Sequence, residues 1–323
     1  MKTKSNRIGD IVDYIHNELK NKYPQSEIKA LTNILFKHYA DMDSSHLLAF
    51  KEDTVNESSL LNLVLATEKL KKYVPVQYIM GRSEFCGLEI RLTPDVLIPR
   101  PETEELTLKI IDAEKGGNSS LTPNSPTVID LCCGSGCIAL AISKFLPFAK
   151  VSALDISHKA LEVSLLNNKR LSLNVYFLQA DITHAADPDF LSLVKNVSLD
   201  GNGNLMQISA DNTTAKFFEE GFDIIVSNPP YVTESEKLTM QRNVLDYEPP
   251  LALFVNDENP LIFYKNIAFF AEKYLKTGGK MYLEVNNSLA SQTAALFSDK
   301  QYIKSIEKDI FGKDRFIFLQ KKA

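Results

Sequence analysis

The sequence contains no tryptophan, only four cysteines among 323 residues, and no excess of basic side chains. Cys86, Cys132, Cys133 and Cys137 are too few and too clustered for a disulfide framework, which indicates a reducing compartment. The formal net charge of −5 argues against extensive electrostatic binding to nucleic acid, because nucleic-acid-binding proteins normally carry a basic surface. We therefore expect no direct contact with nucleic acid.

Long apolar runs are also missing, and the longest fall well short of the roughly 18 residues that a membrane-spanning helix requires. The N-terminal stretch MKTKSNRIGDIVDYIHNEL places charges in every turn and has no apolar core followed by small residues, so no signal peptide is expected. These absences predict a soluble, cytoplasmic protein without a membrane partner, and we expect a monomer.

The patterns that hold metal ions are incomplete. Cys133 and Cys137 have the first gap of an iron–sulfur arrangement, but Leu140 stands at its third position, which favours small packing residues. The stretch DGNGN at 200–204 resembles the start of a calcium loop, but Leu205 stands where the loop needs glycine, which favours a hairpin turn. The sequence predicts no metal site.

Apolar residues recur at helical spacing through the first 80 residues, as in Ile8, Ile11, Ile15 and Leu19. A small helical bundle over 1–80 is therefore predicted, and it is a candidate for substrate recognition.

A β-hairpin linker is expected over 81–100. FCGLEIRL is typical of a strand, TPD indicates a turn, and VLI indicates a second short strand. The following PRPETEEL places proline before acidic residues, which predicts a helix over 102–114.

Strand-like and helix-like segments alternate after the Gly-, Ser- and Pro-rich stretch 114–126. The strand-like runs are TVIDL, KVSALD, NVYFLQAD, FDIIVSN and KMYLEV, with helices expected from about residue 137, over 157–172 and over 260–276. This alternation predicts an α/β domain over 101–323, with a mostly parallel sheet wrapped by helices on both faces. We expect one antiparallel hairpin at the C-terminus and another inside the long connection 183–222.

The motif DLCCGSGC, from Asp130 to Cys137, follows the first of these strands and opens a helix. Gly134 and Gly136 allow a tight turn and the close approach of a ligand to N–H groups at the helix start. Asp155 ends the next strand, where its carboxylate can accept hydrogen bonds from both hydroxyls of a ribose. The pattern predicts a nucleotide or adenosine site. Because Cys132 replaces the first glycine of a dinucleotide fingerprint, NAD is a poor fit.

The run FDIIVS is followed by NPPY. Its two prolines prevent a central strand from continuing past this point. A primary amide or aromatic amine is a poor nucleophile because its lone pair is delocalised, so an enzyme must hold the NH₂ group in orientation. Asn228 can accept one N–H through its side-chain oxygen and the carbonyl of Pro229 can accept the other. Pro230 helps to fix that carbonyl, and Tyr231 can stack on the planar group.

Taken together, these features resemble the class I S-adenosylmethionine-dependent methyltransferases. The motifs PVQYIMG, EFCGLEI, VLIPRPETEEL, DLCCGSGCIALAIS, SNPPYV and YEPPLALF follow the order seen in the HemK/PrmC family, the protein-(glutamine-N5) methyltransferases of peptide chain release factors. The resemblance implies a Rossmann-like methyltransferase sheet with an antiparallel C-terminal hairpin, preceded by the helical bundle. It also implies methyl transfer from S-adenosyl-L-methionine, leaving S-adenosyl-L-homocysteine, to the glutamine of a release factor's Gly-Gly-Gln tip.

The same resemblance implies roles for individual residues. The cofactor would be held by Asp130, Cys132, Cys133, Gly134, Ser135 and Gly136, with Asp155 on its ribose and with Asp181, Ile182 and Asn228 nearby. The glutamine would be received by Asn228, Pro229, Pro230 and Tyr231, with Arg100 and Thr103 near the cofactor or substrate entrance.

Three alternatives stay open on the residues. An adenine-N6 nucleic-acid methyltransferase would use the same four residues, Asn228 to Tyr231, the NPPY tetrad. It would also need a basic groove or recognition domain. A ribosomal-protein glutamine methyltransferase is disfavoured by PVQYIMG and IPRPETE. An adaptor that binds without transferring methyl is disfavoured by the intact Asp155 and Asn228.

Overall fold

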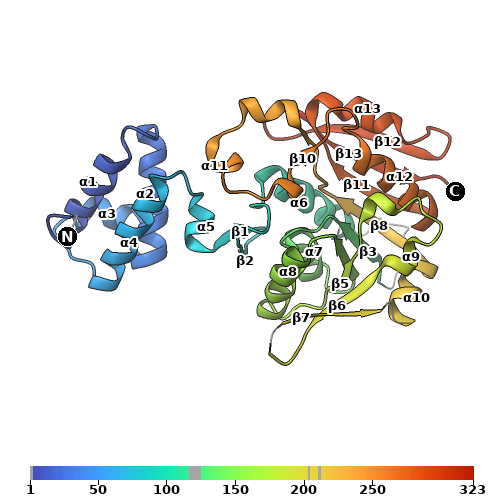
Figure 1. Ribbon diagram of the computed structural model, residues 1–323, viewed down its shortest axis with the longest axis horizontal. Helices are drawn as coiled ribbons and strands as arrows, with labels where there is room; N and C mark the ends of the chain where they lie inside the picture. Colours follow the sequence, from blue (N-terminus) through green and yellow to red (C-terminus); the bar gives the residue numbers. More distant parts are fainter. Residues whose placement is uncertain (1–2, 116–124, 203, 210–211) are drawn as a thin grey trace. The chain divides into compact units, whose positions relative to one another are not determined.

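The computed structural model describes residues 3–115, 125–202, 204–209 and 212–323. The chain divides into two compact units, Met1–Gly81 with Gln241–Tyr247 and Arg82–Met240 with Glu248–Ala323 (Figure 1). Each unit has a hydrophobic core of its own.

The first unit is helical, as predicted. Its helices are α1 (Ile8–Leu19), α2 (Gln25–Ala40), α3 (Ser44–Ala49), α4 (Glu57–Leu70) and α5 (Val76–Met80). The apolar stripes meet in one core, because Ile8, Ile11, Ile15 and Leu19 are fully buried against side chains from α2 and α4. Asn56 caps α4, since its side chain accepts a hydrogen bond from the backbone N–H of Ser59.

A later segment of the chain belongs to this first unit. Gln241–Tyr247, which includes α11 (Arg242–Leu245), packs beside the end of α4. The guanidinium of Arg242 lies 5.1 Å from the centroid of the Tyr73 ring, and the Tyr247 hydroxyl donates to the Lys72 carbonyl at 2.7 Å. No pattern in the sequence predicts this return.

The second unit is built on a large sheet, which confirms the predicted α/β class. In the described residues it has nine strands in the order β12–β13–β11–β8–β3–β4–β5–β6–β7. Their bounds are β3 (Thr127–Leu131), β4 (Lys150–Asp155), β5 (Tyr176–Gln179), β6 (Lys195–Leu199), β7 (Leu205–Ser209), β8 (Phe222–Ser227), β11 (Leu275–Glu284), β12 (Tyr302–Lys308) and β13 (Asp314–Lys321). The central strands from β11 to β5 pair in parallel, and the pairs at both edges are antiparallel.

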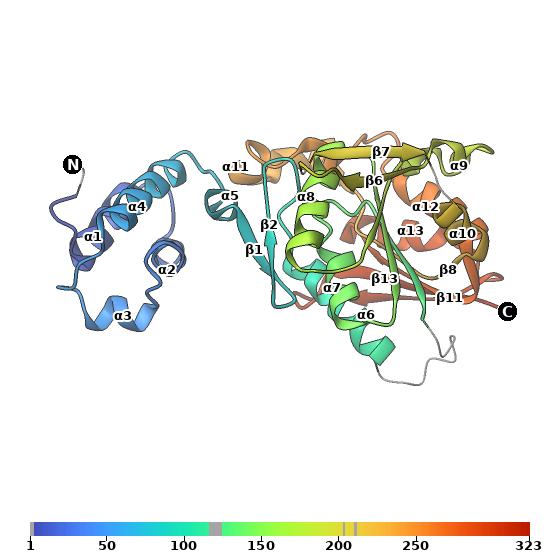
Figure 2. The ribbon, with the colours of Figure 1, turned by 90° about the horizontal axis from the view of Figure 1, so that it is seen from below.

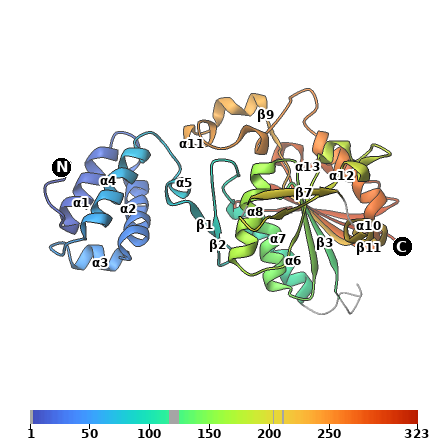
Figure 3. The same cartoon turned by 60° about the horizontal axis from the view of Figure 1, so that its bottom comes forward.

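Helices cover both faces of this sheet (Figures 2 and 3). One face carries α6 (Pro101–Lys115), α7 (Cys137–Phe145) and α8 (His158–Arg170), and the other carries α10 (Asn212–Glu220), α12 (Ile262–Tyr274) and α13 (Ala290–Ala295). Every residue of β3 is therefore buried, with Ile129 and Leu131 in the same core as Tyr264 and Phe270 of α12. Burial on both faces explains why these strands are continuous apolar runs.

The hairpin before α6 differs from the prediction. Its strands are β1 (Arg82–Phe85) and β2 (Leu88–Arg91), and the segment 96–98, expected as a strand, is irregular. The turn lies inside the run expected as one strand, at Cys86 and Gly87, which have φ values of 49° and 71°. Two residues with positive φ make the tight turn whose twist matches a hairpin.

The long connection 183–222 contains the expected antiparallel hairpin, formed by β6 and β7. β6 pairs with β5, so the hairpin extends the main sheet at that edge. The remaining short elements are η1 (Ile182–His184), α9 (Phe190–Leu193), β9 (Val232–Thr233), η2 (Glu234–Thr239), η3 (Pro250–Ala252), β10 (Phe254–Val255) and η4 (Asn287–Leu289).

Candidate active site

The two motifs singled out in the sequence begin side by side. The chain runs from β3 outward through β4, β5, β6 and β7, then crosses to β8 on the other side of β3. β3 and β8 are parallel neighbours, with Leu131 opposite Ser227, so Cys132 and Asn228 follow the same edge of the sheet. A reversal of strand order opens a crevice at the carboxyl ends of the strands, where ligands bind in sheets of this kind.

The loop after β3 has an unusual backbone. Cys132, Gly134 and Gly136 have φ values of 62°, 54° and 77°. A Cβ on Gly136 would lie 3.1 Å from the Cβ of Ser164, whereas a Cβ on Gly134 would meet nothing within 4 Å. The loop is therefore packed against the protein at Gly136 and open at Gly134. Cys132 adopts this left-handed conformation at a cost of about 1 kcal/mol.

Helix α8 holds the loop from behind. The Ser164 hydroxyl donates to the Gly134 carbonyl at 2.6 Å, and Asn167 Nδ2 donates to the Ser135 carbonyl at 3.2 Å. Asn167 is fully buried. Neither Ser164 nor Asn167 was predicted from the sequence, because neither belongs to a motif and both lie inside a helix.

Two buried carboxyl groups accept hydrogen bonds from the loop and from the helix that follows it. Asp155 Oδ2 accepts from Gly134 N at 2.8 Å, and burial raises the pKa of Asp155. Asp130 Oδ2 accepts from Ala139 N at 3.2 Å, but its Oδ1 has no hydrogen-bond partner within the described part of the chain. Burial raises the pKa of Asp130 well above its usual value. Asp155 Oδ1 already accepts from Ser157 N at 2.8 Å, so among the described residues Asp130 Oδ1 is the unpartnered oxygen of this pair. A cationic ligand would favour the ionised form of both carboxyl groups.

The other two predicted cofactor residues follow β5. Asp181 caps η1, since its Oδ1 accepts from Thr183 N at 2.9 Å. The side chain of Ile182 is buried in the main core. Its expected place beside an adenine ring stays a prediction.

Asn228 is joined to Glu284 through a threonine. Asn228 Nδ2 donates to Thr103 Oγ1 at 2.9 Å, and the Thr103 hydroxyl donates to Glu284 Oε2 at 2.7 Å. The Tyr231 hydroxyl donates to the other carboxylate oxygen, Glu284 Oε1, at 3.0 Å. Thr103 thus takes one N–H of the Asn228 amide, and the Asn228 Oδ1 remains as an acceptor for a ligand.

Glu284 ends β11 and is 1% exposed. Burial raises its pKa to about 7, opposed by the hydrogen bonds from Thr103 and Tyr231 and by the charge of Arg315. The guanidinium of Arg315 lies 5.9 Å from the centroid of the Tyr231 ring. A cation beside a half-buried aromatic ring and a buried carboxylate helps to keep both in place.

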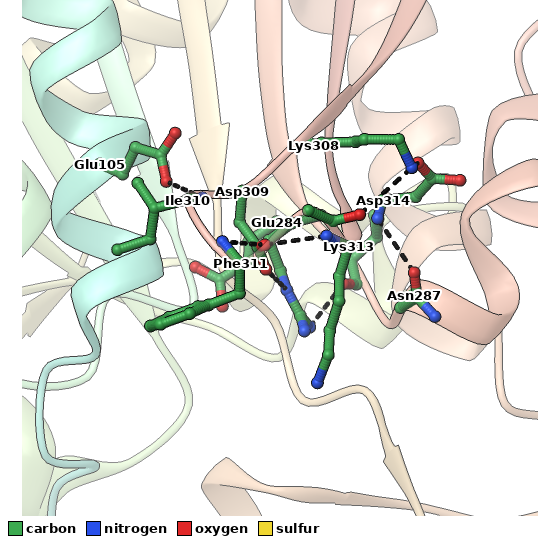
Figure 4. A network of polar contacts seen from close by, with 12 residues as sticks. Glu105, Glu284, Asn287, Lys308, Asp309, Ile310, Phe311, Lys313 and Asp314 are labelled. Carbon is green, nitrogen blue, oxygen red and sulfur yellow. Dashed lines mark hydrogen bonds and ion pairs between the residues drawn. The ribbon is translucent and has the colours of Figure 1, made fainter.

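The turn between β12 and β13 places Asp309 beside Phe311 and Lys313 (Figure 4), and Asp309 also binds Arg315. Asp309 Oδ2 accepts from Arg315 Nε at 3.2 Å, and Asp309 Oδ1 accepts from the N–H groups of Phe311 and Lys313 at 2.9 and 3.0 Å. Burial opposes ionisation of Asp309, but the hydrogen bonds from Lys313, Arg315 and Phe311 outweigh it and lower the pKa of this carboxyl.

Arg100 and Thr103, predicted together at the entrance, have different partners. Thr103 meets Asn228, whereas Arg100 Nη2 forms a 2.7 Å ion pair with Glu248 Oε1 in the YEPP segment. Glu248 Oε2 also accepts from Ile98 N at 3.3 Å. Arg100 therefore ties the segment before α6 to the segment after the tetrad.

Glu284 and Arg315 were not predicted as site residues from the sequence. Glu284 had a usable signal, because it is the carboxylate that ends a buried parallel strand, the same feature by which Asp155 was chosen. Arg315 had none, since its role depends on how β13 pairs with β11.

The described residues contain no group of three or more His, Cys, Asp or Glu side chains placed to hold a metal ion. Within the same residues, no helix has the length and apolar character needed to cross a bilayer.

Comparison with known proteins gives consistent matches. A family profile described as the PrmC N-terminal domain matches residues 10–81, and one described as the methyltransferase small domain matches residues 118–198. A release factor glutamine methyltransferase of Bacteroides thetaiotaomicron is 38% identical over 95% of this chain and 98% of that protein. Proteins of the same description from Flavobacterium psychrophilum and Lactococcus lactis are 33% and 32% identical, over 93% and 88% of this chain and 94% and 91% of theirs.

Proposed function

The chain belongs to the release factor glutamine methyltransferase family, and from this premise we propose that it methylates the side-chain amide nitrogen, N5, of the glutamine in a release factor's Gly-Gly-Gln motif. The observation that carries the proposal is the orientation of Asn228. Its Nδ2 is held by Thr103 at 2.9 Å, which leaves Oδ1 to accept from an amide N–H.

The methyl donor in this proposal is S-adenosyl-L-methionine. When bound, it supplies an electrophilic methyl group on a sulfonium and leaves as S-adenosyl-L-homocysteine. The residues that would hold it are the loop from Cys132 to Gly136, Asp130 and Asp155. They fit a cation with a ribose, because the loop is open at Gly134 and Asp130 Oδ1 has no partner among the described residues.

The tetrad would align the amide and stabilise its developing charge. Asn228 Oδ1 would accept one N–H and the Pro229 carbonyl the other, so that the nitrogen lone pair is directed at the methyl group. Positive charge grows on that nitrogen as the new bond forms, and two oxygen acceptors stabilise it more strongly in the transition state than before. The N–H proton becomes acidic only after attack has begun, so no strong base has to act first. As the N–C bond forms and the S–C bond breaks, this proton is released to water.

The decisive experiment follows labelled methyl from S-adenosyl-L-methionine. The substrates are a purified release factor, the same factor with the motif glutamine replaced by alanine, DNA and tRNA. We expect label on the unaltered factor alone. Label on the alanine variant, or only on nucleic acid, contradicts the proposal. The second of these outcomes would favour an adenine-N6 activity, which uses the same tetrad.

A further inference from the structure

Glu284 occupies a position from which it can set the direction of a chain of hydrogen bonds. Its two carboxylate oxygens face two hydroxyl groups, those of Thr103 and Tyr231, at 2.7 and 3.0 Å. An ionised carboxylate accepts hydrogen bonds and has none to donate, so both hydroxyls must donate to it. Thr103 has one hydroxyl proton, and that proton is used on Glu284.

The consequence falls on Asn228. The Thr103 hydroxyl donates its one hydrogen bond to Glu284. Its oxygen can therefore only accept a hydrogen bond from Asn228, as it does at 2.9 Å. The asparagine must then direct its NH₂ group toward Thr103, which leaves its side-chain oxygen directed away from Thr103. The two ends of an asparagine amide have nearly the same shape, so packing alone distinguishes them poorly and the polarity of a hydrogen-bond partner decides.

We propose that Glu284, acting through Thr103, is a positioning residue that makes the tetrad offer an oxygen rather than an NH₂ group to its substrate. The inference rests on the proposed function, since an outward oxygen matters only if the substrate brings an amide N–H to it. Glu284 itself does not touch the substrate in this scheme, and neither does Thr103.

The groups around Glu284 allow its protonation to reverse the orientation of the Asn228 amide. The carboxyl of Glu284 is influenced by Thr103, Tyr231, Arg315 and Glu102, and its backbone carbonyl accepts from the Tyr264 hydroxyl at 2.8 Å. Arg315 favours the ionised carboxylate, whereas burial and Glu102 oppose it. Once protonated, Glu284 could donate to Thr103, which would free the threonine proton for Asn228 Oδ1 and turn the amide around.

The test uses the full chain with release factor and S-adenosyl-L-methionine, in the variants Thr103→Val, Thr103→Ser and Glu284→Gln. The valine variant keeps the shape of threonine and removes the hydroxyl, whereas the serine variant keeps the hydroxyl. We expect Thr103→Val and Glu284→Gln to lower kcat about tenfold or more, on the scale of one lost buried hydrogen bond. KM for the factor and calorimetric affinity for the cofactor should change less than about twofold, and Thr103→Ser should restore most of kcat.

A matched control is Glu114→Gln. Glu114 is also a buried glutamate, on α6, and it pairs with Lys280 at 2.7 Å. No hydrogen bond among the described residues joins it to Asn228, Thr103 or Tyr231. Its replacement should leave kcat and the pH profile unchanged. The double variant Thr103→Val with Glu284→Gln should be no slower than the slower single variant, because both changes act on one chain of bonds.

The pH profile is the readout that a merely structural role would not move. In the wild type, kcat should fall as pH drops below about 7, where Glu284 takes up a proton. Thr103→Val and Glu284→Gln should lose this acidic limb. If Glu284→Gln folds poorly, the side-chain amide resonances of labelled Asn228 give the same answer, because they should shift with pH in the wild type and not in Thr103→Val.

Two results would overturn the inference. One is wild-type kcat in Thr103→Val, and the other is an acidic limb that persists in both variants. Failure of the proposed function looks different, since the wild-type enzyme itself would then transfer no methyl to the release factor.

Discussion

Thr103 and Asn228 are 125 residues apart in the chain, and a 2.9 Å hydrogen bond from Asn228 Nδ2 to Thr103 Oγ1 joins them. The first comes from the opening turn of α6 and the second from the end of β8. This bond connects the PRPETE motif to the NPPY tetrad, two stretches that the sequence shows only as separate signals. Both belong to one hydrogen-bonded unit with Glu284 at its base.

Replacing Asn228 with alanine should abolish transfer while the cofactor still binds. Asn228→Ala removes the oxygen that would accept the substrate N–H, and we expect kcat to fall by about 10² or more, as for other lost transition-state acceptors. Calorimetry with S-adenosyl-L-methionine should show a much smaller loss. Asn266→Ala is the control, since Asn266 lies on α12 and its Nδ2 donates to the Ile262 carbonyl of the same helix. Equal loss of transfer and cofactor binding would make Asn228 chiefly a cofactor contact.

The two glycines of the loop should respond differently to alanine. Gly136→Ala places a Cβ 3.1 Å from Ser164 Cβ at a φ of 77°, so we expect a loss of about 1–3 kcal/mol in unfolding free energy. Gly134→Ala has open space at a φ of 54°, so stability should fall by only about 1 kcal/mol. Its added methyl group stands on the open side of the loop and should weaken cofactor binding. Denaturant titration and calorimetry on both variants separate the two effects.

Cofactor binding should release protons. Burial raises the pKa of both Asp130 and Asp155 in the unbound protein. A bound cation favours their ionised forms and lowers those pKa values, so affinity for S-adenosyl-L-methionine should rise with pH until both groups are ionised. Calorimetric enthalpies measured in buffers of different ionisation enthalpy count the protons released. Asp130→Asn should reduce that count, and an unchanged count would show that Asp130 is not coupled to the ligand.

Glu284 should make the fold less stable as pH rises. Its pKa is raised from an ordinary value of 4.5 to about 7, so between these values the folded protein binds more protons than the unfolded chain. Stability therefore decreases as pH rises through this range, by up to about 3 kcal/mol, and levels off about one unit above the folded-state pKa. Glu284→Gln should remove this contribution, so that the variant gains relative to wild type between pH 5 and 8. Urea titrations at both pH values measure the difference, and a parallel dependence in the two proteins would contradict it.

The main strands and the principal helices were predictable because their signals are local. A strand buried on both faces is a continuous apolar run, as TVIDL and FDIIVS are, and an amphipathic helix repeats its apolar residues every three or four positions. The hairpin before α6 shows the limit of this reasoning. Cys86 adopts a left-handed backbone conformation, which is uncommon for cysteine. The turn was therefore predicted at TPD, residues 93–95, instead of at Cys86 and Gly87.

Part of the candidate site could be predicted from local sequence signals as well. Gly134, Gly136 and Asp155 follow from rules about backbone freedom and strand ends, and NPPY follows from what proline forbids. Ser164, Asn167 and Arg315 could not be found, because each acts on a partner that is close in space and carries no fixed spacing in the chain.

The sequence by itself therefore determined the alternating α/β architecture, the glycine loop and the place where β8 must stop. Only the tertiary structure decided that Thr103 meets Glu284 across 181 residues, and that Gln241–Tyr247 belongs with the N-terminal helices. The reason is physical. Conformational preference and hydrophobic period are properties of neighbouring residues, whereas the partner of a buried polar atom is set by strand order and register.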